Sequence, residues 1–152
     1  GIPQHRYVTR GYAATANLFV RRAVFNTIGG FDSSRLSGGD AEFCRRAGRR
    51  GHRLRFVDGA MVQHPARRTW GQLATKARRI KGGQLTGGTW QRRLGFAIRT
   101  FVPPVMSISQ LLRQDGQPLR YRLTAVAVRL RLWTVEMLEA LRLALGGPPE
   151  RR

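Results

Sequence analysis

The chain is best understood from residues 38–46, which read Gly38-Gly39-Asp40-Ala41-Glu42-Phe43-Cys44-Arg45-Arg46. Two glycines form a loop, and an acidic residue follows where a helix can begin. Asp40 can cap this helix, and Glu42 lies in its first turn, where the positive end of the helix dipole favours an acid. Phe43 and Ala47 fall on one apolar face. The stretch therefore predicts a carboxylate at a loop-to-helix junction.

The residues before this stretch predict a buried strand and then a short helix. Ala13 to Val20 is small and then apolar, which is typical of a buried strand. Arg21 to Ile28 is predicted to be helical and to stop at Gly29-Gly30, because glycine accepts the left-handed conformation after a helix. Residues 1–12 are polar and turn-rich, and we expect a loop there.

The residues after the stretch predict two more strands and a helix. Arg53 to Val57 alternates in polarity, Asp58-Gly59 is a turn, and Ala60 to His64 is a second short strand. Residues 68–81 fit a helix with apolar side chains at spacings of three and four. Four glycines between 82 and 88 then break the chain. We therefore predict one domain over residues 1–88 and a tail over residues 89–152.

The tail is helical in pattern. Apolar side chains recur every three or four residues at Leu123, Val126, Leu130, Trp133, Met137 and Leu141, whereas Arg122, Arg129 and Glu136 fall seven apart on another face. One interpretation is a core helix. The other is a helix lying on a membrane, with arginines at the headgroups and Trp133 and the leucines in the acyl boundary. A spanning helix needs about 20 apolar residues, and no segment has them without including an arginine.

The composition excludes several classes of protein. The 152 residues include 28 basic and 8 acidic side chains, for a net charge of +20, but 41% are hydrophobic, too many for a disordered basic tail. A single cysteine, Cys44, excludes an internal disulfide and favours a reducing compartment. Arginine far outnumbers lysine, which indicates compositional bias. Stacking aromatics are not interleaved with the charges, so nucleic acid is not the expected partner.

The scarce acidic residues are the best candidates for chemistry. Three of the eight fall between Asp32 and Glu42. A carboxylate oriented by backbone amides can act as a general base towards a substrate hydroxyl, although helix caps are far commoner than bases. The three histidines lack the spacing of a helical zinc site, and the glycine pairs lack the lysine of a phosphate-binding loop.

Residues 13–84 resemble the acceptor-side half of a family-2 glycosyltransferase, an inverting enzyme of the GT-A fold. The resemblance is carried by residues 15–22 (Thr-Ala-Asn-Leu-Phe-Val-Arg-Arg), 24–25 (Val-Phe), 29–32 (Gly-Gly-Phe-Asp), 38–46, 51–54 (Gly-His-Arg-Leu), Val57 and 60–65 (Ala-Met-Val-Gln-His-Pro). It implies an α/β chain: a partial GT-A domain, similar to nucleotide-diphospho-sugar transferases, followed by the amphipathic helical tail.

The resemblance also implies roles for particular residues. Asp40 matches the general base that deprotonates the acceptor hydroxyl, and His64 matches a histidine that helps to hold a divalent metal, Mn²⁺ or Mg²⁺. Asn17, Gly39 and Glu42 are expected at the substrate pockets. Arg78 and Lys81 are expected to face the diphosphate, whose leaving charge needs cationic stabilisation. The implied function is transfer of a sugar from a nucleotide sugar to a hydroxyl acceptor with inversion.

This chain departs from the family pattern in two ways. Gly39 stands where the family usually has an acid before the base. The nucleotide-binding half, with its Asp-x-Asp metal motif, is absent, so the metal is expected to be held mostly by that half. We therefore expect the chain to be part of a longer transferase. The alternative is a non-catalytic basic module that binds nucleic acid or an anionic membrane surface.

The expected partners and location follow from the same resemblance and from the tail. The acceptor is expected to be a glycan of the cell envelope or a lipid-linked molecule. Residues 94–145 are expected to make peripheral membrane contact. The expected location is cytoplasmic, at the inner face of the plasma membrane.

Overall fold

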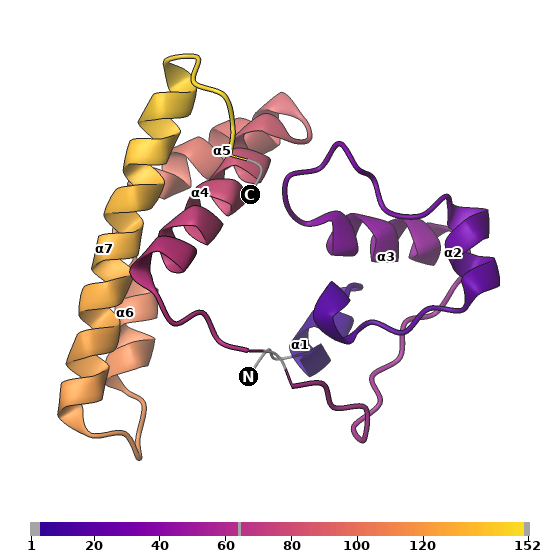
Figure 1. Ribbon diagram of the computed structural model, residues 1–152, viewed down its shortest axis with the longest axis horizontal. Coiled ribbons are helices and arrows are strands. Elements are labelled where there is room, and N and C mark those ends of the chain that lie inside the picture. The colour runs from indigo at the N-terminus through magenta and orange to yellow at the C-terminus, as the bar shows by residue number, and fades with distance from the viewer. Residues whose placement is uncertain (1–3, 64, 151–152) are drawn as a thin grey trace. The chain divides into compact units, whose positions relative to one another are not determined.

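The computed structural model describes residues 4–63 and 65–150 and consists of helices joined by loops (Figure 1). The elements are α1 (Gln4–Val8), the 3-10 helix η1 (Thr15–Asn17), α2 (Arg22–Ile28), α3 (Gly39–Arg49), α4 (Trp70–Thr86), α5 (Trp90–Phe101), α6 (Val105–Leu112) and α7 (Leu119–Ala144). They divide into two compact units, Gly1–Ala66 and Arg67–Arg152.

The predicted α/β fold class is wrong, because residues 4–63 and 65–150 contain helices and no strand. Residues 13–20 contain η1, and residues 53–57 and 60–63 have no regular structure. Near Ala60 the described backbone-to-backbone bonds are short-range turn bonds, from Ala60 N to Val57 O and from Met61 N to Gly59 O. Alternating polarity shows that a segment could pleat, but a strand also needs a neighbour for its hydrogen-bond ladder. The segments described here have no such neighbour.

The first unit is built on a small core between α2 and α3. Ile28, Phe43, Cys44 and Ala47 are buried, and partly buried side chains such as Leu18 and Phe25 pack around them. α2 ends as predicted at Gly29, whose φ of 84° is left-handed, and the amides of Gly29 and Gly30 donate to Asn26 O and Phe25 O. This turn delivers Phe31 to the ring of Phe43, with 4.9 Å between the ring centroids.

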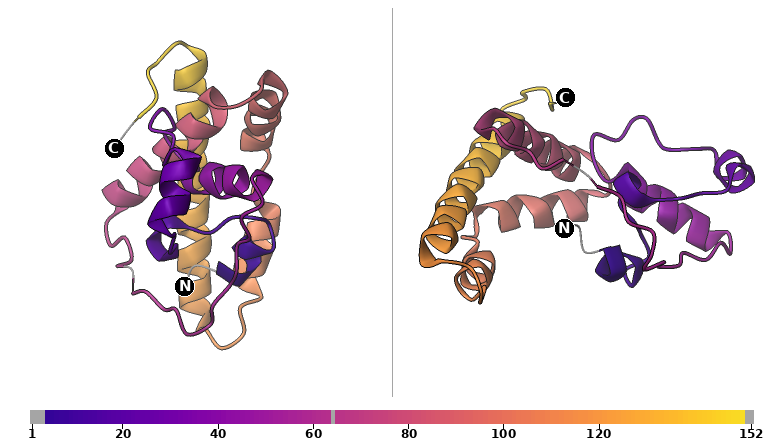
Figure 2. Two further views of the ribbon diagram at one scale, coloured as in Figure 1. Left: turned by 90° about the vertical axis from the view of Figure 1, so that its right-hand side faces the viewer. Right: turned by 60° about the horizontal axis from the view of Figure 1, so that its bottom comes forward.

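The second unit is a helical cluster in which α7 packs along α4, α5 and α6. α6 lies beside the N-terminal, orange half of α7 (Figures 1 and 2), where Arg122 Nη1 donates to Leu112 O at 3.0 Å. α4 continues through Gly82 and Gly83, where the sequence predicted a break, because Gly82 is buried within the cluster. The compact units therefore divide at residue 66, and the predicted boundary at residue 88 falls between α4 and α5.

The apolar pattern of α7 divides between two environments. Val126, Trp133 and Met137 are half-buried, whereas Leu123, Leu130 and Leu141 are 53%, 39% and 49% exposed. The indole Nε1 of Trp133 donates to Thr100 O of α5 at 2.8 Å. One part of the apolar pattern is therefore packed within the unit, as the core interpretation predicts, and the other part is exposed. Among the helices described, none has the length and apolar character needed to cross a membrane.

Candidate functional site

Asp40 lies in the first turn of α3, where two backbone amides orient its carboxylate. Ala41 N donates to Oδ1 at 2.8 Å, and Thr15 N donates to Oδ2 at 3.2 Å. Gly38, with a φ of 70°, precedes the helix as its N-cap, so Asp40 lies two residues beyond the capping position. Its side chain is half-buried, which leaves the carboxylate accessible to a hydroxyl group. The geometry required of a base is therefore present.

Glu42 is committed to an ion pair within α3. Arg46 donates from Nε to Oε1 and from Nη2 to Oε2, both at 2.9 Å. The hydrogen bond from Arg46 holds the pKa of the Glu42 carboxyl below its usual range. Arg46 also donates to the carbonyls of Ile28 and Gly30. The pair thus braces the start of α3 against the turn that ends α2, and the sequence did not single out Arg46 for this role.

Asn17 ends η1, whose first residue, Thr15, donates from its amide to the Asp40 carboxylate. Asn17 Nδ2 donates to Ala60 O at 2.8 Å. Asn17 Oδ1 is buried and has no hydrogen-bond partner in the described part of the chain. Gln4 holds the residue before η1 in place, because its side-chain amide donates to Ala14 O and accepts from Ala14 N. Asn17 therefore ties η1 to Ala60 and keeps a buried acceptor atom without a partner among the described residues.

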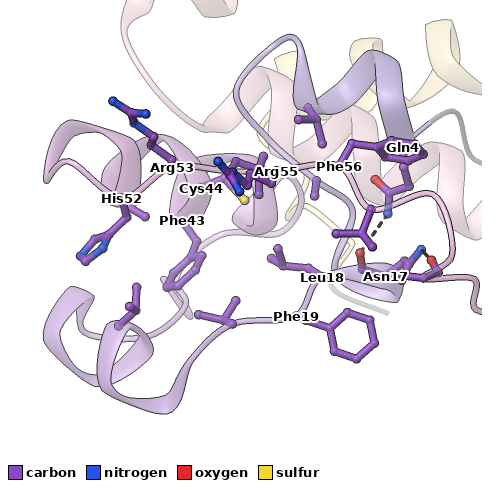
Figure 3. A pocket seen from close by; sticks show the side chains of 18 of the residues that line it. Gln4, Asn17, Leu18, Phe19, Phe43, Cys44, His52, Arg53, Arg55 and Phe56 are labelled. Atoms are coloured by element: carbon purple, nitrogen blue, oxygen red, sulfur yellow. Dashed lines mark hydrogen bonds between the residues drawn. The ribbon is translucent and has the colours of Figure 1, made fainter.

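A cavity of about 620 Å³ adjoins Asn17 within the first unit. Figure 3 shows Gln4 and Asn17 at one end of it and His52 and Arg53 at the other. Most of its wall is apolar and comes from Leu18, Val20, Val24, Phe43, Phe56 and Val57. Its size lies in the range of ligand sites. Cys44 also lines it, and burial raises the pKa of the Cys44 thiol, so this cysteine is a poor nucleophile.

The two predicted diphosphate contacts belong to the second unit and have different surroundings. Arg78 is half-exposed and lies 4.0 Å from the carboxylate of Glu150. Lys81 is buried, and its Nζ donates to Thr100 Oγ1 at 2.9 Å and to Gln84 Oε1 at 3.2 Å. Glu136 lies 3.7 Å from the same Nζ. The donors of Lys81 are thus used within its own unit, where desolvation lowers its pKa.

Two predicted site residues remain. Gly39 opens α3, and a Cβ built there would meet nothing within 4 Å, so the acid usual at this position in the family would have room. His64, the predicted metal ligand, lies outside the described residues. Residues 4–63 and 65–150 do not gather three His, Cys, Asp or Glu side chains into one group that could hold a metal ion. We therefore derive no chemical step through a metal.

The first unit thus links η1 to Asp40 through Thr15, and it adds a cavity that Asn17 lines and that Asp40 and Gly39 do not; sequence reasoning missed this cavity. The predicted loop over residues 1–12 is wrong for Gln4–Val8, which form α1, and the turn-rich composition there gave no sign that Gln4 contacts Ala14. Arg46 could have been noticed four residues after Glu42, at the spacing of a helical ion pair.

Comparison with known proteins identifies the family. The family model described as Glycosyl transferase family group 2 matches residues 5–145. Glycosyltransferase AglE of Haloferax volcanii is 37% identical over 117 residues, which cover 71% of this chain and 38% of AglE. The match therefore spans less than half the length of that relative. No solved structure matches the chain.

The family match covers both units, and the residues that carry the resemblance, including Asp40 and its neighbours, lie within it. The chain belongs to glycosyl transferase family group 2.

Proposed function

We propose that this chain supplies the acceptor side of an inverting glycosyltransferase that uses a nucleotide-sugar donor, with Asp40 as the general base. The observation that carries the proposal is the Asp40 carboxylate, which two backbone amides hold at the start of α3 while a hydroxyl can still reach it. The family match supports the reaction class. The donor sugar and the linkage are not part of the proposal.

In the proposed reaction the acceptor hydroxyl transfers its proton to Asp40 as its oxygen bonds to the anomeric carbon. The bond from that carbon to the diphosphate oxygen breaks, and the nucleotide diphosphate leaves with the electron pair. Attack from the side opposite the leaving group inverts the anomeric centre. One carboxylate suffices for this direct displacement, whereas glycoside hydrolases use a pair. The amide bonds to Asp40 lock the orientation of the base, which favours proton transfer in one geometry.

The neighbours of Asp40 have supporting roles in the proposal. Asn17 Oδ1, buried and without a hydrogen-bond partner among the described residues, would accept a hydrogen bond from the bound acceptor. Gly39 leaves open space beside the base. Glu42 positions α3 through its pair with Arg46 rather than by touching substrate. The largely apolar wall of the cavity, which Asn17 lines and Asp40 does not, supports an acceptor with an apolar part, such as a lipid-linked or cell-envelope glycan.

The donor side is proposed to depend mostly on residues outside this chain. Arg78, half-exposed, is the better placed of the two cations to meet a diphosphate, and Lys81 would contribute by holding the helices together. A divalent cation, Mn²⁺ or Mg²⁺, would neutralise the leaving diphosphate, with His64 as the proposed contact from this chain. Neutral imidazole suits Mn²⁺ better than Mg²⁺, which prefers oxygen ligands.

The test is Asp40→Asn in a protein that joins these residues to a nucleotide-binding half. Loss of a general base should lower kcat by about 10²–10⁴ with little change in donor affinity. Asp58→Asn is the matched control, because Asp58 is an exposed acid in a turn of the same unit. Near-normal kcat in the Asp40 variant would remove Asp40 from the mechanism, and an equal loss in the control would point to a general charge effect.

We also propose a cytoplasmic location with peripheral attachment to the inner face of the plasma membrane. The lone cysteine supports a reducing compartment. Fractionation of the tagged protein tests this, since a peripheral protein should sediment with membranes and leave them at high salt. Recovery in an extracellular fraction would contradict the proposal.

A further inference from the structure

The outward face of α7 carries a continuous stripe of leucines. The exposed members, 39% to 89% accessible, are Leu119, Leu123, Leu130, Leu138, Leu141 and Leu145. At 100° per residue these positions fall within an arc of about 100°, so they form one strip along the helix. The 26 residues of α7 make that strip about 39 Å long. An apolar strip of this length on an outer face indicates a partner surface.

The acidic residues of α7 are turned away from this leucine stripe. Glu136 faces the interior of the unit, where Lys81 lies 3.7 Å away and Arg129 lies 3.4 Å away. Glu139 is 3% exposed and accepts from Arg142 Nη2 at 2.7 Å. α7 therefore buries its polar acidic positions and exposes its leucines, the reverse of an ordinary surface helix.

Cations line one edge of the leucine stripe. Arg120, Arg131 and Arg142 are 11 residues apart, a spacing that returns to almost the same side of the helix. Arg120 lies over the ring of Tyr121, and Arg131 lies 3.9 Å from the centroid of the Trp70 ring. Within the described part of the chain neither of these two arginines forms an ion pair. The outer side of α7 is thus apolar along its middle and cationic along an edge.

We propose that this outer face of α7 lies on an anionic phospholipid bilayer, with the leucines at the acyl boundary and Arg120 and Arg131 at the lipid phosphates. Charge complementarity selects this occupant, because cations beside an apolar strip are attracted to an anionic leaflet. A second copy of the chain is a poorer partner, since each copy carries a net charge of +20. Trp133, which only the membrane interpretation of the sequence placed at the acyl boundary, lies against α5, as the core interpretation predicts. The inference does not depend on the proposed sugar transfer.

Co-sedimentation of the full chain with vesicles tests this inference. The vesicles are phosphatidylcholine alone or phosphatidylcholine mixed with phosphatidylglycerol. The α7 variant is Leu138→Gln with Leu141→Gln, and the matched control is Leu94→Gln with Ile98→Gln in α5. The two pairs are nearly equal in exposure, at 65% and 49% against 51% and 62%. Circular dichroism of each variant serves as the control that its helices are retained.

We expect the native chain to bind the anionic vesicles more tightly than the neutral ones. The α7 variant should lose at least about tenfold in partitioning, because two leucines leave the acyl boundary. Partitioning of the α5 control onto the anionic vesicles should stay within about twofold of the native value. Equal losses in the two variants would overturn the assignment to α7, as would unchanged binding in the α7 variant. Light scattering tests the alternative occupant. If the native chain is a dimer and the α7 variant is a monomer, a second copy of the chain covers the face instead.

Discussion

The two units of this chain bury different kinds of side chain, apolar in the first and partly charged in the second. The first unit has a small apolar core around Phe43 and ties its loops together with side-chain to backbone bonds from Gln4, Asn17 and Arg46. The second unit packs long helices and encloses a polar group, in which Lys81 meets Thr100 and Glu136. The candidate base lies in the unit with little regular structure. Loops held by a few specific bonds can aim a carboxylate, whereas a helical cluster supplies surface and stability.

The largest effect is expected from the core of the first unit. Phe43→Ala should cost about 3–5 kcal/mol, because it empties the position on which Phe25 and Phe31 pack. Hydrogen exchange should then show loss of protection in residues 4–63 and little change in α4 to α7. Phe19→Ala is the control, since Phe19 is 79% exposed. Loss of protection in both units would show that they unfold as one.

The polar interior of the second unit should respond more moderately. Glu136→Gln leaves the buried Lys81 ammonium without its carboxylate and should destabilise the unit by about 1–3 kcal/mol in urea unfolding. Combining Glu136→Gln with Lys81→Met should recover much of that loss of stability, because both charges are then absent. Glu150→Gln is the control, as its contact with Arg78 is long and half-exposed and should be worth under about 0.5 kcal/mol. A double variant no better than Glu136→Gln would contradict a coupled pair.

The ion pair between Glu42 and Arg46 should make the stability of the first unit sensitive to acid. Because Arg46 lowers the pKa of Glu42 in the folded state, the unfolded state binds protons first as the pH falls. The stabilisation is complete above the ordinary glutamate pKa and is lost as the pH falls through the lowered folded value. Hydrogen exchange in residues 39–49, measured at a series of pH values, should show this loss as a slope of the unfolding free energy against pH. In Glu42→Gln the slope should shrink, whereas Asp58→Asn should keep it.

The smallest effects concern two glycines of the first unit. Gly39→Ala should change stability by less than about 1 kcal/mol, since a Cβ there meets open space within a helix. Gly29→Ala should cost about 1–2 kcal/mol, because its φ of 84° is left-handed. Thermal unfolding of both variants measures the difference. Equal melting temperatures would show that the turn after α2 relaxes.

Local signals in the sequence predicted the helices well and the strands poorly. The left-handed glycine after Ile28, the acids at the start of α3 and the three-to-four spacing of the tail all depend on neighbours in the chain. The resemblance over residues 13–84 identified the family, which the comparisons confirm. Residues 53–57 alternate in polarity, yet they form no strand, because pairing requires a second segment that local pattern does not reveal.

For the candidate site, the sequence identified Asp40 and Asn17 as candidates but not what surrounds them. The bond from Thr15 to Asp40 joins residues 25 apart, and the bond from Asn17 to Ala60 joins residues 43 apart. Neither contact follows from spacing. The cavity beside Asn17 has the same origin, since its wall is assembled from four separate stretches between Gln4 and Ala60.

The sequence by itself determined the family, the acidic start of α3, the ends of α2 and the helical character of the tail, since each depends on residue type and short-range order along the chain. Only the tertiary structure decided that Lys81 is enclosed, that Glu42 braces a helix and that α7 turns its acids inward and its leucines outward. A helical pattern shows that a helix has distinct faces. Which face is buried depends on the groups that the other helices present, and here a buried lysine draws Glu136 inward.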